Sequence, residues 1–331
     1  MQAAFLEEPR KIVHRAIDTP EPKAGEVRIK LTNVGICGSD VHLFMGHRTL
    51  AKPTVIGHEG LGYIDKIGEK VEGRQVGERV VVEPNIPCHR CRYCQSGRGN
   101  ICVNKRVVGL LEHGCFAEYV CIPSEFAWAV PHDISGLDAV CIEPMAVGVH
   151  ALFTSSAKPG DAIAIIGLGA IGLLLNHLAL RLGYRVLVTE INQNKLQKAV
   201  QEGAIAANGN VEKLLSMWVE NEVVAVFECA GSAATATLAA SAAPRGAEVV
   251  LVGLSEKSAE FTPLRIAREG ITFVPSIIYD HPTDFKRTLQ LIQRKVVTPS
   301  NIISSFAPLN ELQTALEKAA SGDESKIVVT V

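Results

Sequence analysis

Hydrophobic and polar positions alternate along the first part of the chain as they do in half-buried strands. In residues 26–34, EVRIKLTNV, the apolar Val27, Ile29 and Leu31 are separated by polar residues, and this period of two predicts a strand. Residues 77–84, GERVVVEP, predict another strand, which a proline closes. Glycines are dense between these two segments, and tight turns explain them. The first part of the chain therefore predicts strands and loops.

The pattern changes near residue 160, where short apolar runs begin to alternate with helical stretches. Near-continuous apolar strands separated by helices indicate a parallel sheet that is covered on both faces. Strands are expected at 162–166, 185–189, 223–227, 248–252 and 271–274. Helices are expected at 173–182 and 192–202, and in the segment that ends at Pro244. Two more helices, at 283–295 and 309–321, and a last strand at 326–331 are expected beyond residue 280.

The two patterns predict an α/β protein with two domains. Residues 149–280 are expected to form a doubly wound, Rossmann-type domain around the parallel sheet, since strands and helices alternate throughout it. Residues 1–148 and 281–331 are expected to form the second, β-rich domain together.

Composition and charge remove several classes of function. The 331 residues are 47% hydrophobic and 21% charged, with a net charge of −2, so they lack the basic excess that nucleic-acid binding needs. The longest apolar run, AIAIIGLGAIGLLL, is interrupted by glycines and is too short to span a bilayer. The first residues do not follow a signal-peptide pattern, and nine cysteines without one favour a reducing compartment. We therefore expect a cytoplasmic protein that binds neither nucleic acid nor membrane.

A glycine-rich turn follows the first expected strand of the parallel sheet and opens a helix. This is the context in which a GxGxxG motif binds a dinucleotide, because the helix N-terminus faces the pyrophosphate. An acidic residue is expected about 20 residues further on, where it accepts hydrogen bonds from the ribose and repels a 2′-phosphate. Glu190 stands there, so NAD is favoured over NADP; the alternative is that the glycines serve only packing. The candidate residues are Gly167, Leu168, Gly169, Ala170, Ile171, Gly172 and Glu190.

Four cysteines in residues 87–102, PCHRCRYCQSGRGNIC, have the spacing of a metal site. An iron–sulfur cluster is the alternative to zinc, but a ferredoxin-type run continues with three residues and Cys-Pro, whereas here seven residues intervene and valine follows. Four thiolates fill the coordination sphere of zinc, so this site is expected to be structural. His89 is expected to be exposed. The expected ligands are Cys88, Cys91, Cys94 and Cys102.

A catalytic zinc keeps one position open and needs three protein ligands. Scattered motifs offer such ligands: GICGSDVH at 35–42, GHEG at 57–60 and IEPMAVGVH at 142–150. Each motif is a weak signal by itself. The candidates they contain are Cys37, His58, Glu59 and Glu143.

The order of these motifs along the whole chain resembles the zinc-dependent medium-chain dehydrogenases. Within that family the chain is most similar to the polyol (sorbitol) and threonine dehydrogenases, because Glu143 stands where the alcohol-dehydrogenase branch usually has a cysteine. The resemblance implies a GroES-like fold for the β-rich catalytic domain, one catalytic and one structural zinc per chain, NAD, and a homo-oligomer, either dimer or tetramer.

The resemblance also implies individual roles. Cys37 and His58 would be zinc ligands, and Glu59 and Glu143 would be carboxylates at the metal, with either one bound directly, through water or in alternation. Asp40 would orient a ligand. Ser39 would lie beside the substrate oxygen, and His42 would pass its proton to solvent.

The expected reaction is hydride transfer between NAD(H) and a secondary alcohol or ketone, with a polyol or sugar-derived alcohol as the favoured substrate. Zinc would act as a Lewis acid that favours loss of the hydroxyl proton. His47 and Arg48, in the loop at 44–52, and the segment 110–113 are candidates for substrate contacts, although a solvated loop is equally compatible with the sequence. L-threonine and a sugar phosphate are alternative substrates. A metal-free reductase and a non-catalytic zinc- or NAD-binding protein are alternative functions.

Overall fold

The computed structural model describes residues 1–48 and 50–331 of the chain. These residues form two compact units. The first contains Met1–Glu143 and Thr298–Val331, and the second contains Pro144–Val297. The boundaries expected from the sequence were at 148 and 280, so the second unit extends further than expected at both ends.

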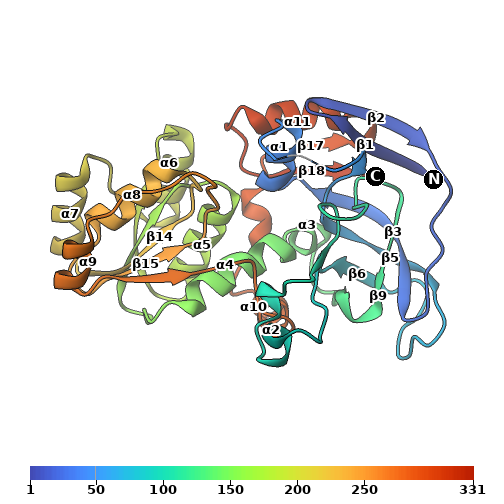
Figure 1. Ribbon diagram of the computed structural model, residues 1–331, viewed down its shortest axis with the longest axis horizontal. Helices are drawn as coiled ribbons and strands as arrows, with labels where there is room; N and C mark the ends of the chain where they lie inside the picture. The colour runs from blue at the N-terminus through green and yellow to red at the C-terminus, as the bar shows by residue number, and fades with distance from the viewer. Residues whose placement is uncertain (49) are drawn as a thin grey trace. The chain divides into compact units, whose positions relative to one another are not determined.

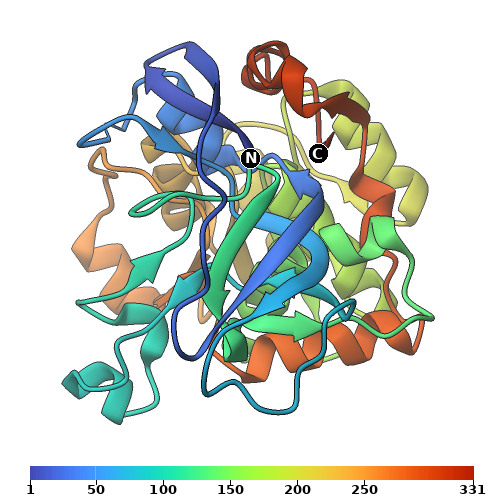
Figure 2. The same ribbon diagram turned by 90° about the vertical axis from the view of Figure 1, so that its right-hand side faces the viewer.

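The first unit is built mainly from antiparallel strands. Its large sheet has seven strands in the order β10-β6-β5-β3-β18-β17, with β9 also paired to β3. These strands are β3 (Glu26–Gly35), β5 (Glu59–Ile67), β6 (Arg79–Val82), β9 (Tyr119–Pro123), β10 (Ala127–Ala129), β17 (Ser305–Pro308) and β18 (Ile327–Thr330). Figure 2 shows these strands in the view in which the right-hand side of Figure 1 faces the reader. The expected alternation in β3 is confirmed, since Val27, Ile29 and Leu31 are all buried.

Smaller elements complete the first unit. A three-stranded sheet has the order β2-β1-β4, and β7 pairs with β8. The strands are β1 (Gln2–Glu8), β2 (Lys11–Ala16), β4 (Thr54–Val55), β7 (Asn85–Ile86) and β8 (Arg106–Val107). The helices are α1 (Gly38–Phe44), α2 (Arg92–Gln95), α3 (Gly136–Val140) and α11 (Leu312–Ala320), and the 3-10 turns are η1 (Gly99–Ile101), η2 (Ser124–Phe126), η3 (Pro299–Ile302) and η4 (Leu309–Glu311). The helix α4 (Ile142–Thr154) begins at the end of this unit and continues into the second.

The second unit contains a six-stranded sheet, parallel throughout, in the order β13-β12-β11-β14-β15-β16. Its strands are β11 (Ala162–Ile166), β12 (Arg185–Thr189), β13 (Ile205–Ala206), β14 (Val223–Glu228), β15 (Glu248–Leu251) and β16 (Thr272–Pro275). The helices are α5 (Ala170–Arg181), α6 (Gln193–Glu202), α7 (Val211–Glu220), α8 (Ala233–Ala242), α9 (Pro263–Glu269) and α10 (Thr283–Gln293). Figure 1 shows α5, α6, α7, α8 and α9 around β14 and β15. The predicted fold class is confirmed.

The parallel sheet follows directly from the sequence, because every residue of β11 is buried and five consecutive apolar side chains can be accommodated only between two layers of helices. Trp218 of α7 and Phe227 of β14 are fully buried. No described helix is both long enough and apolar enough to cross a lipid bilayer.

Candidate functional site

Three of the expected metal ligands meet in the first unit. Cys37 lies between β3 and α1, His58 directly precedes β5, and Glu59 is the first residue of β5. One ligand atom from each of the three lies within 4.8 Å of the other two. His58 and Glu59 are buried, and Cys37 is half-buried. The antiparallel pairing of β3 with β5 brings these segments together, since it places Gly35 opposite Glu59.

The buried carboxylate of Asp40 fixes the two loops that carry this group. One oxygen accepts a hydrogen bond from the backbone N–H of Cys37 at 2.9 Å, and the other accepts one from the N–H of Gly57 at 3.1 Å. The second oxygen also lies 3.6 Å from Nδ1 of His58. Burial by itself lowers the pKa of His58, but the Asp40 carboxylate and the Cys37 sulfur outweigh it and raise the pKa well above its usual value.

Glu59 has a partner that the sequence does not reveal. Nζ of Lys326 lies 2.6 Å from each of its carboxylate oxygens, and both side chains are almost completely buried. Lys326 directly precedes β18, the strand on the other side of β3 from β5. A single lysine before an apolar strand gives no sequence signal of a contact across 267 positions.

The carboxylate of Glu59 lies against Gly35, where β3 has no side chain. A Cβ atom at this position would lie 1.9 Å from an oxygen of Glu59. Only a glycine leaves room for the carboxylate at this place. This explains why the motif GICGSD begins with a glycine, Gly35.

The donor set of this group suits a zinc ion. A thiol sulfur, an imidazole nitrogen and a carboxylate oxygen are the ligand types that zinc binds in proteins. Nδ1 of His58 is buried without a hydrogen bond, so bonding within the protein does not fully satisfy the imidazole. Glu143 is buried in the first turn of α4. Among the described residues, it does not belong to the group of Cys37, His58 and Glu59, whose ligand atoms lie within 4.8 Å of one another.

Ser39 and His42 lie three residues apart on α1 and therefore on the same side of it. Ser39 is half-buried and His42 is exposed. Nδ1 of His42 lies 3.3 Å from Nδ1 of His47, the loop histidine considered above as a substrate contact. Arg48 is exposed, and Thr49 of the same loop lies outside the described residues.

His113, in the other segment considered for substrate contacts, has a structural bond. Its Nδ1 accepts a hydrogen bond from the N–H of Val55 at 3.1 Å, so this nitrogen stabilises the local fold.

The four cysteines of 88–102 also come together, with all four sulfur atoms within 4.8 Å of one another. The sulfur of Cys91 lies 3.5 Å from that of Cys94 and 3.8 Å from that of Cys102. Zn–S bonds of about 2.3 Å in a tetrahedron place the sulfurs about 3.8 Å apart, so the spacing fits zinc. His89 is exposed, as expected.

The surroundings of the four cysteines shift the pKa values of Cys88 and Cys94 in opposite directions. Hydrogen bonds from the backbone of Arg90 and Cys91 lower the pKa of Cys88 to about 6. Loss of hydration and the neighbouring thiols raise the pKa of Cys94 to about 12. Four close thiols cannot all ionise at neutral pH by themselves, because their charges repel, and a bound cation removes that obstacle.

The glycine turn of the second unit has the form that dinucleotide binding requires. Gly167 has a φ of +90°, and a Cβ there would lie 2.6 Å from Ala230. A Cβ on Gly172 would lie 2.0 Å from the carbonyl oxygen of Gly167, so this glycine allows α5 to approach the turn. A Cβ on Gly169 would meet nothing within 4 Å, and the space beside the backbone there is open. The helix α5 begins directly after Gly169, so its first backbone N–H groups, which have no partner within the helix, are available to bind phosphate.

Glu190 follows β12 and is fixed by backbone donors. One carboxylate oxygen accepts a hydrogen bond from the N–H of Leu168 in the glycine turn at 2.5 Å, and the other accepts bonds from Ile191 and Asn192, each at 2.8 Å. Asn208, which the sequence did not single out, bonds to both the backbone N–H and the carbonyl of Glu190. The acidic residue and the turn therefore form one connected structure.

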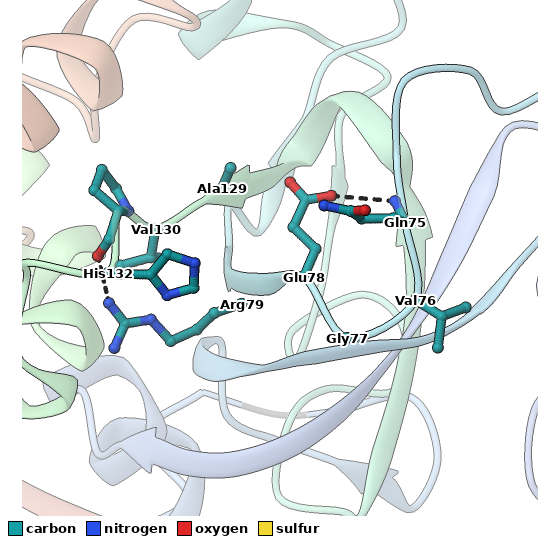
Figure 3. A pocket seen from close by; sticks show the side chains of 9 residues that line it. Gln75, Val76, Gly77, Glu78, Arg79, Ala129, Val130 and His132 are labelled. Carbon is teal, nitrogen blue, oxygen red and sulfur yellow. Dashed lines mark hydrogen bonds between the residues drawn. The ribbon is translucent and has the colours of Figure 1, made fainter.

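A cavity of about 500 Å³ lies elsewhere in the first unit, between Gln75 and His132 (Figure 3). Arg79 crosses it and donates hydrogen bonds to the carbonyls of Pro131 at 2.5 Å and Ile134 at 2.7 Å. Its lining contains none of the expected metal, catalytic or cofactor residues within the described chain. Its size alone does not make it the reaction site.

Comparison with known proteins gives the family. Residues 23–132 match the alcohol dehydrogenase GroES-like domain, and residues 170–294 match the zinc-binding dehydrogenase domain. The sorbitol dehydrogenase of Bacillus subtilis strain 168 is 30% identical over 331 aligned residues, which cover 96% of this chain and 93% of the relative.

Two solved structures extend the similarity to cofactor complexes. An alcohol dehydrogenase from Escherichia coli CFT073, complexed with NADH, is 29% identical with a TM-score of 0.91, over 100% of this chain and 99% of that one. A zinc-binding dehydrogenase from Sinorhizobium meliloti 1021, bound to NADP, is 31% identical with a TM-score of 0.92, over the same shares of the two chains.

The chain belongs to the zinc-dependent medium-chain dehydrogenases. Within that family it lies in the polyol branch, as Glu143 had indicated, and it is an oxidoreductase that uses zinc and a nicotinamide dinucleotide.

A Cys91→Ser variant tests the structural role of the four-cysteine site. We expect it to lose one zinc per chain and about 3 kcal/mol of unfolding free energy, or roughly 10 °C in Tm, because the loop loses its crosslink. Elemental analysis and calorimetry measure the two quantities. Cys121→Ser, at a thiol outside the cluster, is the matched control. A Cys91→Ser protein with unchanged Tm but no turnover would contradict a structural role.

Proposed function

We propose that this protein oxidises a secondary alcohol of a polyol or sugar-derived compound with NAD, at a zinc ion held by Cys37, His58 and a carboxylate. The observation that carries the proposal is the mixed donor group of Cys37, His58 and Glu59. Unlike the four-thiolate site, a mixed group with three protein ligands leaves zinc a position for the substrate. Glu143 is the second carboxylate of the proposed site.

Zinc, when bound, supplies Lewis acidity that makes a hydroxyl proton easier to remove, and NAD accepts the hydride. The chain provides the surroundings for this chemistry. Asp40 orients the backbone on both sides of the group through its bonds to Cys37 and Gly57. Cys37 and His58 hold the metal.

Proton removal is assigned to α1. In the proposal, Oγ of Ser39 takes the hydroxyl proton of the substrate and passes its own proton to His42. The shared helix face of the two residues supports this relay, and so do the exposure of His42 and its contact with His47, which continue the path towards solvent. One proton leaves the substrate oxygen and one hydride leaves the carbon, so the alcohol becomes a ketone.

The preference for NAD rests on Glu190. Its carboxylate lies beside the glycine turn, and three backbone donors hold it there. A carboxylate accepts bonds from ribose hydroxyls and repels the 2′-phosphate of NADP.

A polyol is the preferred substrate class because Glu143 replaces the cysteine of the alcohol-dehydrogenase branch and because the match to the sorbitol dehydrogenase relative covers 96% of this chain. L-threonine and sugar phosphates are the alternatives within the family. His47 and Arg48, both exposed near the proposed relay, are the feature that favours a charged substrate over a neutral one. We further propose a cytoplasmic homo-oligomer, a dimer or a tetramer, that uses a small molecule as its substrate.

Replacement of a proposed catalytic ligand tests the zinc assignment. We expect Cys37→Ser and His58→Ala each to lower turnover by about 100-fold or more and to remove one zinc per chain, while NADH binding stays within a factor of three, because the dinucleotide residues lie in the other unit. Steady-state kinetics, elemental analysis and NADH fluorescence titration provide the three readouts. Full turnover in a variant shown to have lost that zinc would disprove the assignment.

Glu190 is tested by Glu190→Ala with Glu190→Gln as the variant that keeps the size and removes the charge. Both are expected to lower the ratio of kcat/KM for NAD to that for NADP by about tenfold or more, because a charged hydrogen-bond acceptor is lost. If the ratio stays at its wild-type value in both variants, Glu190 does not select the cofactor.

A screen of NADH production tests the substrate class. We expect sugar alcohols to give the highest kcat/KM in a panel that also contains aldonic acids, sugar phosphates and L-threonine, since a pocket selects by its few polar contacts. Higher activity with an anionic member of the panel would favour the alternative in which His47 and Arg48 contact the substrate. A zinc-loaded protein without activity on any alcohol would favour the non-catalytic alternative.

A further inference from the structure

Glu190 stands at a point of the chain where the backbone has left the parallel sheet. The last residue of β12 is Thr189, and the neighbouring strand β13 ends at Ala206. The helix α6 begins only at Gln193, and Ile191, which lies between the strand and the helix, is 95% exposed. Regular secondary structure therefore does not fix the backbone of the residue on which the proposed choice of cofactor depends.

Side chains extend the pairing of β12 and β13 past this point. The register of the two strands ends at Ala206. Oγ1 of Thr189 then donates a hydrogen bond to the carbonyl oxygen of Ala207 at 2.6 Å. The side chain of Asn208 follows: its Oδ1 accepts a hydrogen bond from the N–H of Glu190, and its Nδ2 donates one to the carbonyl oxygen of Glu190, each at 3.1 Å.

The amide group of Asn208 binds Glu190 as a neighbouring peptide group would. An asparagine side chain has an acceptor and donors on one planar group, so it can bond to the N–H and the carbonyl of the same residue. A displacement of the backbone at Glu190 would break both bonds at once. Asn208 is half-buried and carries no charge, so it fixes the acidic residue without changing the charge of the site.

The carboxylate of Glu190 needs a fixed backbone because its own bonds are directional. One of its oxygens accepts a hydrogen bond from the N–H of Leu168 in the glycine turn at 2.5 Å. The other accepts bonds from the N–H groups of Ile191 and Asn192, each at 2.8 Å. A shift of the backbone would move the carboxylate relative to the glycine turn, and so relative to the ribose of a dinucleotide bound there.

We propose that Asn208 is a positioning residue for cofactor selection. It holds the backbone of Glu190 so that the carboxylate stays beside the glycine turn, where it accepts hydrogen bonds from ribose hydroxyls and repels a 2′-phosphate. The inference rests on the proposed function, because it requires Glu190 to select NAD. Asn208 acts through Glu190 alone and does not touch the dinucleotide.

A double-variant cycle with Glu190→Gln tests this coupling, with the ratio of kcat/KM for NAD to that for NADP as the readout. Asn208→Ala is expected to lower the ratio about fivefold through a higher KM for NAD. Its kcat is expected to stay within about twofold of wild type, because the metal group lies in the other unit. Once Glu190→Gln is present, the same substitution is expected to change the ratio by less than about twofold, since residues that act through one group are not additive.

Asn221→Ala is the matched control. The side chain of Asn221 also makes two hydrogen bonds, accepting one from Arg185 and donating one to the carbonyl oxygen of Met217, both at 2.8 Å. Arg185 is the first residue of β12, so this asparagine holds the opposite end of the strand that precedes Glu190. Its replacement is expected to lower Tm and to leave the ratio within about twofold of wild type.

The inference is overturned if Asn208→Ala leaves the ratio within about twofold of wild type, if Asn221→Ala lowers it equally, or if the two substitutions of the double variant act independently. If Asn208→Ala does not fold, Asn208→Ser decides by the same criteria, because its hydroxyl is too short to bond to both backbone groups of Glu190. A ratio that Glu190→Gln itself leaves unchanged would refute the proposed selection of NAD, and the inference with it.

Discussion

The absence of a side chain at Gly35 is the constraint on which the mixed metal group depends. Three neighbouring strands, β5, β3 and β18, carry Glu59, Gly35 and the approach to Lys326 side by side. Because the central strand has no Cβ at this point, a carboxylate and an ammonium group meet above it inside the protein. A buried ion pair is stable only when its geometry and hydrogen bonds are nearly complete, and here the carbonyl of Ile36, directly after β3, provides the remaining acceptor. The strand order β5-β3-β18 therefore brings the carboxylate of Glu59 and its counter-ion together.

The two candidate metal sites differ in how their ligands are arranged along the chain, and this difference matches a structural role for one and a catalytic role for the other. The four cysteines lie within one short segment, and local backbone donors lower the pKa of two of them, Cys88 and Cys91. The mixed group is drawn from separate segments, and the carboxylate of Asp40 fixes these segments by accepting hydrogen bonds from their backbone. A local site of identical ligands suits a permanent crosslink. A dispersed site of different ligands can leave one position to a substrate.

The sequence was sufficient where a feature depends on local pattern. The apolar run of β11 predicted a parallel sheet, the cysteine spacing predicted a cluster, and the strand–turn–helix context predicted the glycine loop. Helices α4, α7 and α9 were not predicted, and α1 lies where only turns were expected. The helix α1 has only seven residues, and it is supported by the bond from the N–H of its N-cap, Cys37, to Asp40 and by the burial of Leu43 and Phe44.

Contacts between residues far apart in the sequence could not be predicted from the sequence alone. Lys326 and Asn208 are single polar residues beside a strand, and nothing in their neighbourhood distinguishes them from residues that face solvent. Their partners become visible only when the strand order is known. The roles of Ser39 and His42 came from family resemblance alone, because a serine and a histidine on a short helix carry no signal by themselves.

The second unit is inserted between the two parts of the first, and this has a consequence for biosynthesis. A ribosome that has released β3, α1 and β5 has already produced Cys37, His58 and Glu59, yet the counter-ion of Glu59 follows only after the entire parallel-sheet unit. The buried ion pair of Glu59 and Lys326 therefore cannot form until β18 has been made and has paired with β3. The residues of the mixed metal group are all synthesised well before their final surroundings exist.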